Sequence, residues 1–151
     1  MKKNLVMICV FLFTSVRLFA TASWYGKGFE GKLSASGYVY AANQLTCASN
    51  DHPFGTVLKV TNKANMKSVM VVVLDRGSFK EKYGRKIDLS KEAFTKIAKI
   101  GEGLINVKIE VMSKNKSFKY KHGKPVFTAK EYDTFLSDCL LYTSDAADDS
   151  L

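Results

Sequence analysis

The sequence SVMVVVLDRG occupies residues 68–77 and decides the fold. After Ser68, residues 69–74 form an unbroken apolar run, which the two charged residues Asp75 and Arg76 follow. This pattern predicts a strand buried on both faces. Shorter extended segments surround it, separated by turn residues. We expect them at residues 22–25, 38–41, 45–48, 56–61, 86–89 and 103–112. Short strands in this number predict an all-β fold, a small closed β-barrel.

A single helix is expected directly after the segment at residues 86–89. Ser90 can cap its first turn, where Glu92 interacts favourably with the helix dipole. Phe94 and Ile97 recur at helical spacing, and Gly101 is expected to end the helix. The folded unit is therefore a β-barrel with one helix, and we expect it to span residues 21–112.

The composition is that of an ordinary globular chain, with 46% hydrophobic residues, 25% charged residues and a net charge of +9. Such a basic surface favours polyanions or an anionic cell envelope as partners. The chain has no arginine-rich pattern for reading nucleic acid, so no nucleic acid is expected as a partner. Its His, Cys, Asp and Glu residues lack the spacing of metal ligands, so neither a metal nor another cofactor is expected.

Residues 1–20 are typical of a secretory signal peptide. A cationic start is followed by the apolar run Leu5–Phe13, which is shorter than the roughly 20 apolar residues that span a bilayer. Cleavage after Ala20 would leave Thr21 as the first residue, and cleavage after Ala22 is the alternative. We therefore expect an exported protein, periplasmic or associated with the cell wall, without a membrane span. An N-terminal core helix is the other interpretation.

The C-terminal part has a different composition. Residues 113–138 are rich in lysine and weakly patterned, which favours a basic linker or tail, or the start of a second module. Such a tail could attach to anionic wall polymers. Residues 139–151 contain no Lys or Arg, and residues 139–148 resemble one reading frame of the adapter used to prepare sequencing libraries. We interpret residues 139–151 as a sequencing artefact; a genuine acidic tail is the alternative.

These boundaries leave one cysteine in the folded unit. Cys9 lies within the signal, in a context unlike that of a lipid-modified cysteine, and Cys139 lies in the suspect segment. Cys47 remains, and we expect a buried, inert thiol and no intramolecular disulfide. An exported domain without disulfides depends on its hydrophobic core.

Six short motifs occur in order along the expected barrel: ASWYG at 22–26, SASG at 34–37, PFGT at 53–56, VTN at 60–62, LDRGSF at 74–79 and IDLS at 87–90. Together they resemble the rare lipoprotein A (RlpA) family over about residues 21–112. The resemblance implies a six-stranded double-psi β-barrel, similar to that of expansins. It also implies an endolytic lytic transglycosylase, which cleaves peptide-poor glycan strands of peptidoglycan to 1,6-anhydromuramyl ends.

The resemblance implies an acidic pair, with one Glu directly after the Ser-Ala-Ser-Gly turn and one Asp in the Asp-Arg-Gly motif. Asp75 matches the second position and is the predicted catalytic residue. Tyr38 occupies the first position, and with an ordinary pKa of about 10 a tyrosine is a poor acid for a glycosidic oxygen. The family's pattern also has a His before the Pro-x-Gly-Thr stretch, and that position is Ser49 here, three residues before His52.

The remaining predicted site residues are substrate-binding. Asp88 lies between two apolar residues, so it faces away from them; in related expansins the Asp of this motif lines the sugar-binding surface, and a structural carboxylate is the alternative. Trp24 and Tyr25 point to opposite faces of their strand, so one is expected in the core and the other could stack on a sugar ring. Tyr38 could also stack on a sugar. Ser23 and Arg76 complete the predicted substrate-binding set. For the predicted catalytic residue Asp75, the alternative is a structural role as a cap at the end of its strand.

Three functions are compatible with these residues. The first is a lytic transglycosylase that uses Asp75. The second is a non-catalytic, expansin-like module that binds peptidoglycan glycan strands. The third, a protein-binding barrel such as a protease inhibitor, has no residue in its favour. Both glycan hypotheses require Asp75, Asp88 and an aromatic residue to converge on one open face. We expect a monomer in either case.

Overall fold

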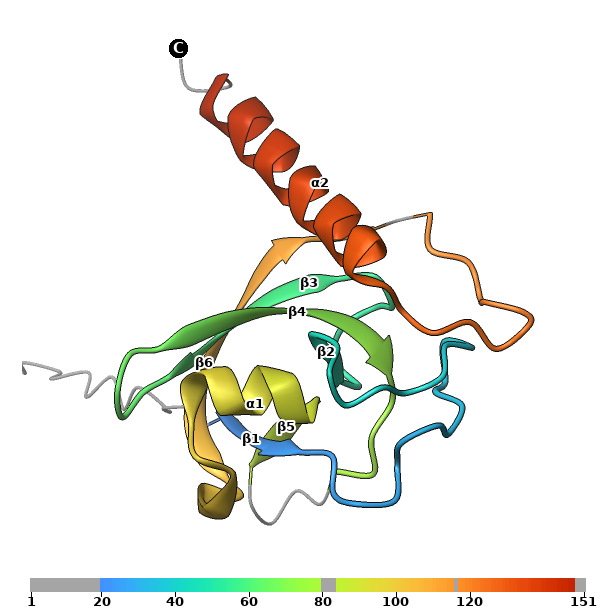
Figure 1. Ribbon diagram of the computed structural model, residues 1–151. Coiled ribbons are helices and arrows are strands. Elements are labelled where there is room, and N and C mark those ends of the chain that lie inside the picture. Colours follow the sequence, from blue (N-terminus) through green and yellow to red (C-terminus); the bar gives the residue numbers. More distant parts are fainter. Residues whose placement is uncertain (1–19, 80–83, 116, 149–151) are drawn as a thin grey trace, which may run out of the picture.

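The computed structural model describes residues 20–79, 84–115 and 117–148. Six strands form a closed barrel in the order β1-β5-β2-β4-β3-β6 (Figure 1). The pairs β1–β5 and β2–β4 are parallel, and the other neighbouring pairs are antiparallel. The strands are β1 (Ala20–Trp24), β2 (Thr46–Ala48), β3 (Val57–Asn62), β4 (Ser68–Asp75), β5 (Arg85–Leu89) and β6 (Ile105–Ser113).

Strand β4 is buried on both faces, as its sequence predicts. Val71 and Val73 point into the barrel core, which also contains Leu58 and Ile87. The alternate residue Val72, together with Leu74, belongs to a second cluster outside the barrel. Full burial of one such side chain stabilises the fold by about 1.5–3 kcal/mol. The apolar run therefore serves two cores at once.

Helix α1 (Lys91–Ile97) begins where the sequence predicts, because the hydroxyl oxygen of Ser90 accepts a hydrogen bond from the backbone N–H of Ala93. Its buried Phe94 and Ile97 close one end of the barrel core. The prediction that Gly101 ends the helix is wrong. The chain leaves α1 at Ala98 and forms a separate 3-10 turn, η2 (Ile100–Glu102), before a glycine with positive φ.

The segment expected as a strand at residues 38–41 is only partly paired. Val39 makes isolated bridges to Leu33 and to Val126. The loop from residue 25 to residue 45 thus runs across the barrel rim instead of joining the barrel wall (Figure 1). This path places its Ser-Ala-Ser-Gly turn beside the end of β4, where the backbone N–H of Ser36 donates to the carbonyl of Leu74.

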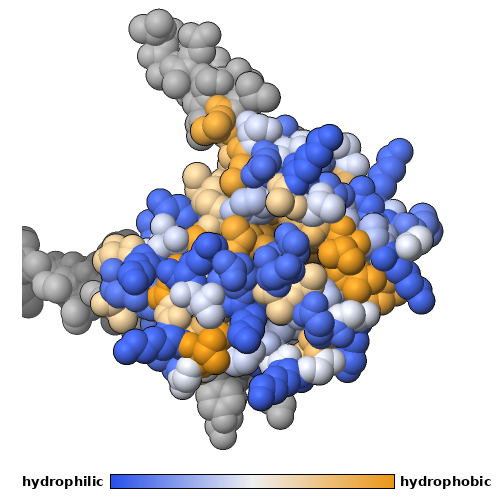
Figure 2. Space-filling view, in the orientation of Figure 1, coloured by the Kyte–Doolittle hydropathy of each residue, from blue (hydrophilic) through white to orange (hydrophobic). Residues whose placement is uncertain are grey.

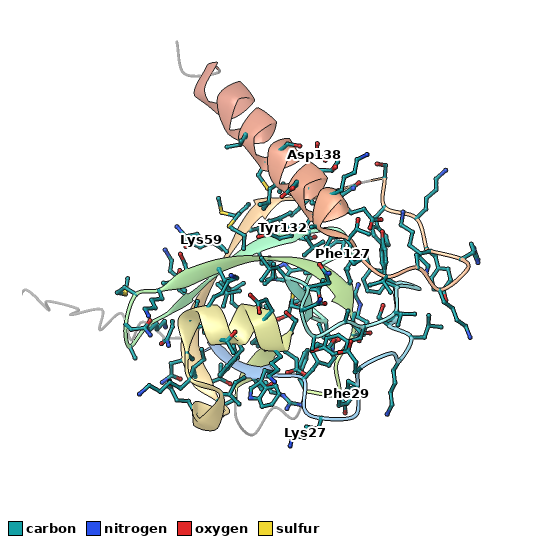
Figure 3. The ribbon with its side chains drawn as sticks, viewed as in Figure 1. Lys27, Phe29, Lys59, Phe127, Tyr132 and Asp138 are labelled. Atoms are coloured by element: carbon teal, nitrogen blue, oxygen red, sulfur yellow. The ribbon has the colours of Figure 1, made fainter. Side chains whose placement is uncertain are left out.

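The expected basic linker at residues 113–138 is instead partly packed on the barrel. Phe127 is buried, and the helix α2 (Ala129–Asp148) that follows it packs against β3 and β6. Tyr132 donates its hydroxyl hydrogen to the carbonyl of Met70 on β4. Figure 3 places Phe127 and Tyr132 where α2 meets the barrel. The linker prediction was wrong because lysine-rich composition concealed an apolar stripe of Phe127, Tyr132, Phe135 and Leu136.

Helix α2 continues through residue 138 without a break, and Cys139 is buried on it. No helix in the described part of the chain is long and apolar enough to cross a membrane. The face shown in Figure 2 is largely hydrophilic, with hydrophobic side chains gathered near the base of α2.

Candidate active site

Asp75 lies at the end of β4, half-buried, and three donors from different parts of the rim converge on its carboxylate. One oxygen, Oδ1, accepts from the backbone N–H groups of Ala35 and Arg76, both at 2.8 Å. The other, Oδ2, accepts from the hydroxyl of Tyr25 at 2.9 Å. A carboxylate held in this way has one orientation, which suits a group that must face a developing charge.

Tyr25 is buried and positions Asp75. Burial, and then the adjacent charge of Asp75, raise the pKa of Tyr25 well above its ordinary value. Its hydroxyl therefore keeps its proton and remains a donor to Asp75. The ring of Tyr40 stacks on that of Tyr25, with 4.4 Å between centroids. Tyr25 is thus packed, and it offers no free face to a sugar in this structure.

Trp24 points to the opposite side of β1, as predicted from strand alternation. Its ring packs 6.5 Å from that of Phe94 and is half-buried against the barrel core. Its outer part lines a cleft of about 350 Å3, to which Lys27 and Lys91 also contribute. Of the two aromatic residues of the ASWYG motif, Trp24 is the one that remains accessible.

Asp88 on β5 is paired with Ser23 on β1, which lies opposite it in the strand register. The hydroxyl of Ser23 donates to Asp88 Oδ1 at 3.0 Å. Asp88 faces away from the fully buried Ile87 and Leu89, as predicted. Burial raises the pKa of Asp88 above its ordinary value, and the charge of Asp75 adds to that rise against the opposing effects of Ser23 and Arg85. The charge of Asp75 therefore acts on Asp88, although the two carboxylates have different hydrogen-bond partners.

Tyr38 is buried, with 2% of its surface exposed. Its hydroxyl donates to Glu131 Oε1 on α2 at 2.7 Å, and its ring meets that of Phe127 edge-on. Burial, and then the hydrogen bond to Glu131, raise its pKa. The prediction that Tyr38 binds substrate directly does not fit this arrangement, because Phe127 and α2 cover the ring.

Glu131 was missed by sequence analysis. Its second oxygen accepts from the backbone N–H and hydroxyl of Thr128, which forms a capping box at the start of α2. Burial acts to raise the pKa of Glu131, but hydrogen bonds from Tyr38 and Thr128 outweigh it and hold that pKa below its ordinary value. The spacing Thr-x-x-Glu is the signal that could have identified the helix start.

The two positions that the resemblance pairs do converge. Asp75 and Tyr38 line one small cavity of about 20 Å3, together with Tyr25 and Phe127. A cavity of this size holds about one water molecule. The barrel rim thus brings together Ser23, Tyr25, Tyr38, Asp75 and Asp88, while Trp24 lies on the cleft next to it.

Arg76 is exposed beside Asp75. Its Nη1 donates to the carbonyl of Ser49 at 2.6 Å, and its guanidinium group lies 3.9 Å above the ring of Phe54. Cys47 is fully buried, and burial raises the pKa of its thiol, as expected for an inert cysteine. Among the described residues, no group of three or more His, Cys, Asp or Glu could hold a metal ion.

A closed six-stranded barrel with two carboxylates on its rim defines this chain as a double-psi β-barrel protein. Residues 19–109 match the family described as lytic transglycolase. The chain belongs to that family.

Curated relatives are proteins named endolytic peptidoglycan transglycosylase RlpA. The Campylobacter jejuni protein is 47% identical over 91 residues, which is 60% of this chain and 32% of the relative. The Vibrio cholerae protein is 45% identical over 98 residues, 65% of this chain and 36% of the relative. The chain thus spans about a third of the length of these relatives.

Solved structures with a similar fold have little sequence in common with the chain. An expansin mutant of Clavibacter michiganensis in complex with cellohexaose is 21% identical with a TM-score of 0.49, over 66% of this chain and 52% of that one. A Streptomyces papain inhibitor is 23% identical with a TM-score of 0.46, over 59% and 89%.

Proposed function

We propose that this protein is a lytic transglycosylase of the cell envelope, which cleaves peptide-poor glycan strands of peptidoglycan to 1,6-anhydromuramyl ends. The proposal rests above all on two carboxylates with different surroundings, Asp75 and Asp88, on one rim of a barrel of this family. The names of the relatives support the same activity.

The reaction needs an acid that protonates the glycosidic oxygen and a negative charge near the anomeric carbon. It does not consume water. The bond between the muramyl anomeric carbon and the glycosidic oxygen breaks as that oxygen takes up a proton. Positive charge that develops at the anomeric carbon is stabilised by a carboxylate. The C6 hydroxyl of the same muramyl residue then bonds to the anomeric carbon and gives up its proton, which closes the anhydro ring.

The surroundings of the two carboxylates favour different roles. Asp75 accepts three hydrogen bonds, which hold its carboxylate in one orientation at the rim. We assign it to the anomeric charge. Burial raises the pKa of Asp88, so its protonated form is more populated than that of an ordinary aspartate, and we assign Asp88 as the proton donor. It would protonate the leaving oxygen and then accept the C6 hydroxyl proton, which returns it to its starting state.

A second candidate function is that of a non-catalytic module that binds glycan strands. It is favoured by Tyr38, which occupies the first acidic position of the family's pattern and is buried against Glu131. Under this hypothesis Asp75, Asp88 and Trp24 still contact the glycan, but no bond is cleaved.

The test is to incubate the processed protein with glycan strands stripped of stem peptides and to detect anhydromuramyl ends by mass spectrometry. We expect product from the wild-type protein and a large loss of product in Asp75→Asn and in Asp88→Asn. A protein that binds the strands but yields no product would support the second function. Lys67→Gln, on the opposite β3–β4 hairpin, is the control and should leave the yield unchanged.

Export is part of the same proposal. Residues 1–19 of the expected signal lie outside the described residues, but the barrel bears on where a signal would be removed. Ala22 is fully buried and pairs with Ile87 and Ile105, so cleavage after Ala22 would remove part of β1. Cleavage after Ala20 keeps these contacts. The intact mass of protein purified from the periplasm would distinguish the two sites.

A further inference from the structure

Arg76 is held in a fixed orientation at the edge of the site. Its guanidinium lies 3.9 Å above the ring of Phe54, and its Nη1 donates to the carbonyl of Ser49. Its own backbone N–H donates to Asp75. An arginine that is stacked and bonded in this way loses little further conformational entropy when it binds a ligand. It is also exposed.

Part of this guanidinium is free to bind. Its Nε and Nη2 groups have no hydrogen-bond acceptor among residues 20–79, 84–115 and 117–148. Arg76 also forms no salt bridge within those residues. The Nε–Nη2 edge is the one that binds a carboxylate with two parallel hydrogen bonds.

A second cation lies at the far end of the same aromatic platform. The ring of Phe118 is 5.8 Å from that of Phe54, and Lys121 Nζ lies 5.8 Å from Phe118. The backbone N–H of Lys121 donates to the carbonyl of Ser36, which ties this basic loop to the turn that also binds Asp75. Glu131 partly balances the charge of Lys121. The surface beside Asp75 therefore carries two cations, Arg76 and Lys121, next to the tilted ring pair of Phe54 and Phe118.

We propose that Arg76, with Lys121 as a weaker second cation, is a carboxylate-binding subsite that recognises the free lactyl carboxylate of muramyl residues. This inference rests on the proposed function, since it takes the muramyl strand as ligand. Each muramyl residue carries that carboxylate free when its peptide has been removed and as an amide when the peptide is present. A fixed fork beside the catalytic carboxylate thus distinguishes stripped strands from peptide-bearing ones.

The test measures binding and needs no turnover. Stripped strands with free carboxylates are compared with the same strands converted to methylamides, using the processed wild-type protein in a sedimentation assay. Because charge-assisted, two-point hydrogen bonds are strong, we expect a preference of about tenfold for the free acid. The preference should decrease with added salt. Equal binding of the two forms would overturn the proposal without any variant.

Variants assign the preference to Arg76. Arg76→Gln should lose it, and Arg76→Lys, which keeps the charge but not the fork, should keep only part of it. Lys67→Gln removes the same charge from the far hairpin and should retain the full preference. If Arg76→Gln is folded, as judged by its melting temperature, and still prefers the free acid, the subsite is elsewhere. Wild-type protein that prefers only peptide-bearing strands would place recognition on the stem peptide and overturn the proposal.

Failure of the carboxylate-binding subsite can be distinguished from failure of the proposed transglycosylase activity. A wild-type protein that yields anhydromuramyl ends but binds both strand types equally keeps its activity and refutes the subsite. A wild-type protein that yields no product but prefers the free acid keeps the subsite and refutes the transglycosylase activity.

Discussion

The barrel rim contains two positions that the family's pattern makes acidic, and their surroundings differ sharply. At one, Asp75 is half-buried, faces three donors and lies beside the exposed Arg76. At the other, Tyr38 is covered by Phe127 and bound to Glu131. The first position presents an ordered carboxylate at the rim, whereas the second belongs to a packing interface with α2. Two positions on one rim can thus differ in kind, since one side chain stays at the surface and the other is packed under a helix.

The largest expected effect comes from Asp75→Asn. The amide keeps the shape of the side chain, and its oxygen can still accept from Ala35 and Arg76, so the fold should persist. Loss of the charge should lower the rate of anhydromuramyl formation by about 10²–10⁴-fold, as for other groups that act in the transition state. The rate is measured by mass spectrometry of digested strands. An unchanged rate would remove Asp75 from the catalytic pair.

The next largest effect is expected at the interface that covers Tyr38. Phe127→Ala removes the ring that covers Tyr38 and should destabilise the fold by about 3–5 kcal/mol, the usual cost for a buried phenylalanine. Phe29→Ala is the matched control, because Phe29 is 45% exposed, contacts the ring of Tyr25 and lies away from Phe127 (Figure 3). Urea denaturation gives both values. Similar losses in the two variants would mean that Phe127 is not part of the packed interface.

The sequence predicted the first position far better than the second. Strand β4, which ends at Asp75, and the cap of α1 follow from local patterns of apolar and capping residues. The electrostatic interaction of Asp75 with Asp88 is the convergence that the glycan hypotheses require. The burial of Tyr38 depends on Glu131, which lies 93 residues away in the chain. No local pattern around Tyr38 encodes that contact, and the lysine-rich composition of residues 113–130 hid the helix that supplies it.

A double-mutant cycle would sharpen the second position. Tyr38→Phe removes the hydroxyl that donates to Glu131, and Glu131→Gln removes the charge that accepts it. Each variant should lose about 1.5–3 kcal/mol, the range for a hydrogen bond to a charged group. The double variant should lose less than the sum, because the two residues contact each other. Additive losses in urea denaturation would show that the hydrogen bond contributes nothing to stability.

The pH dependence of that coupling has a definite sign. The pKa of Glu131 is lower in the folded protein than its ordinary value of 4.5, so the stabilisation is present above that pH. It is lost as the pH falls through the folded-state pKa. The coupling energy of the Tyr38–Glu131 cycle should therefore shrink in acid. A coupling that is unchanged across this range would point to packing as its source.

The smallest expected effect is the pH dependence of stability that comes from Asp88. Burial raises the pKa of Asp88 above its ordinary value of 3.8, so its ionised form is disfavoured in the folded state. Its contribution to stability is complete below pH 3.8 and is lost as the pH rises through the folded-state pKa. The stability of Asp88→Asn relative to the wild-type protein should therefore be higher at neutral pH than in acid. The variant should be inactive.

Thermal unfolding of Asp88→Asn and the wild-type protein across this pH range measures the difference in stability. Ser23→Ala is a companion variant that should change it in a known direction. Ser23→Ala removes the hydrogen bond that favours the ionised form of Asp88, so it should raise the pKa of Asp88 further and steepen the loss of stability with rising pH. If Asp88→Asn and the wild-type protein respond identically to pH, Asp88 titrates as an ordinary aspartate. In that case the assignment of Asp88 as the acid would fail, whereas the role of Asp75 would stand.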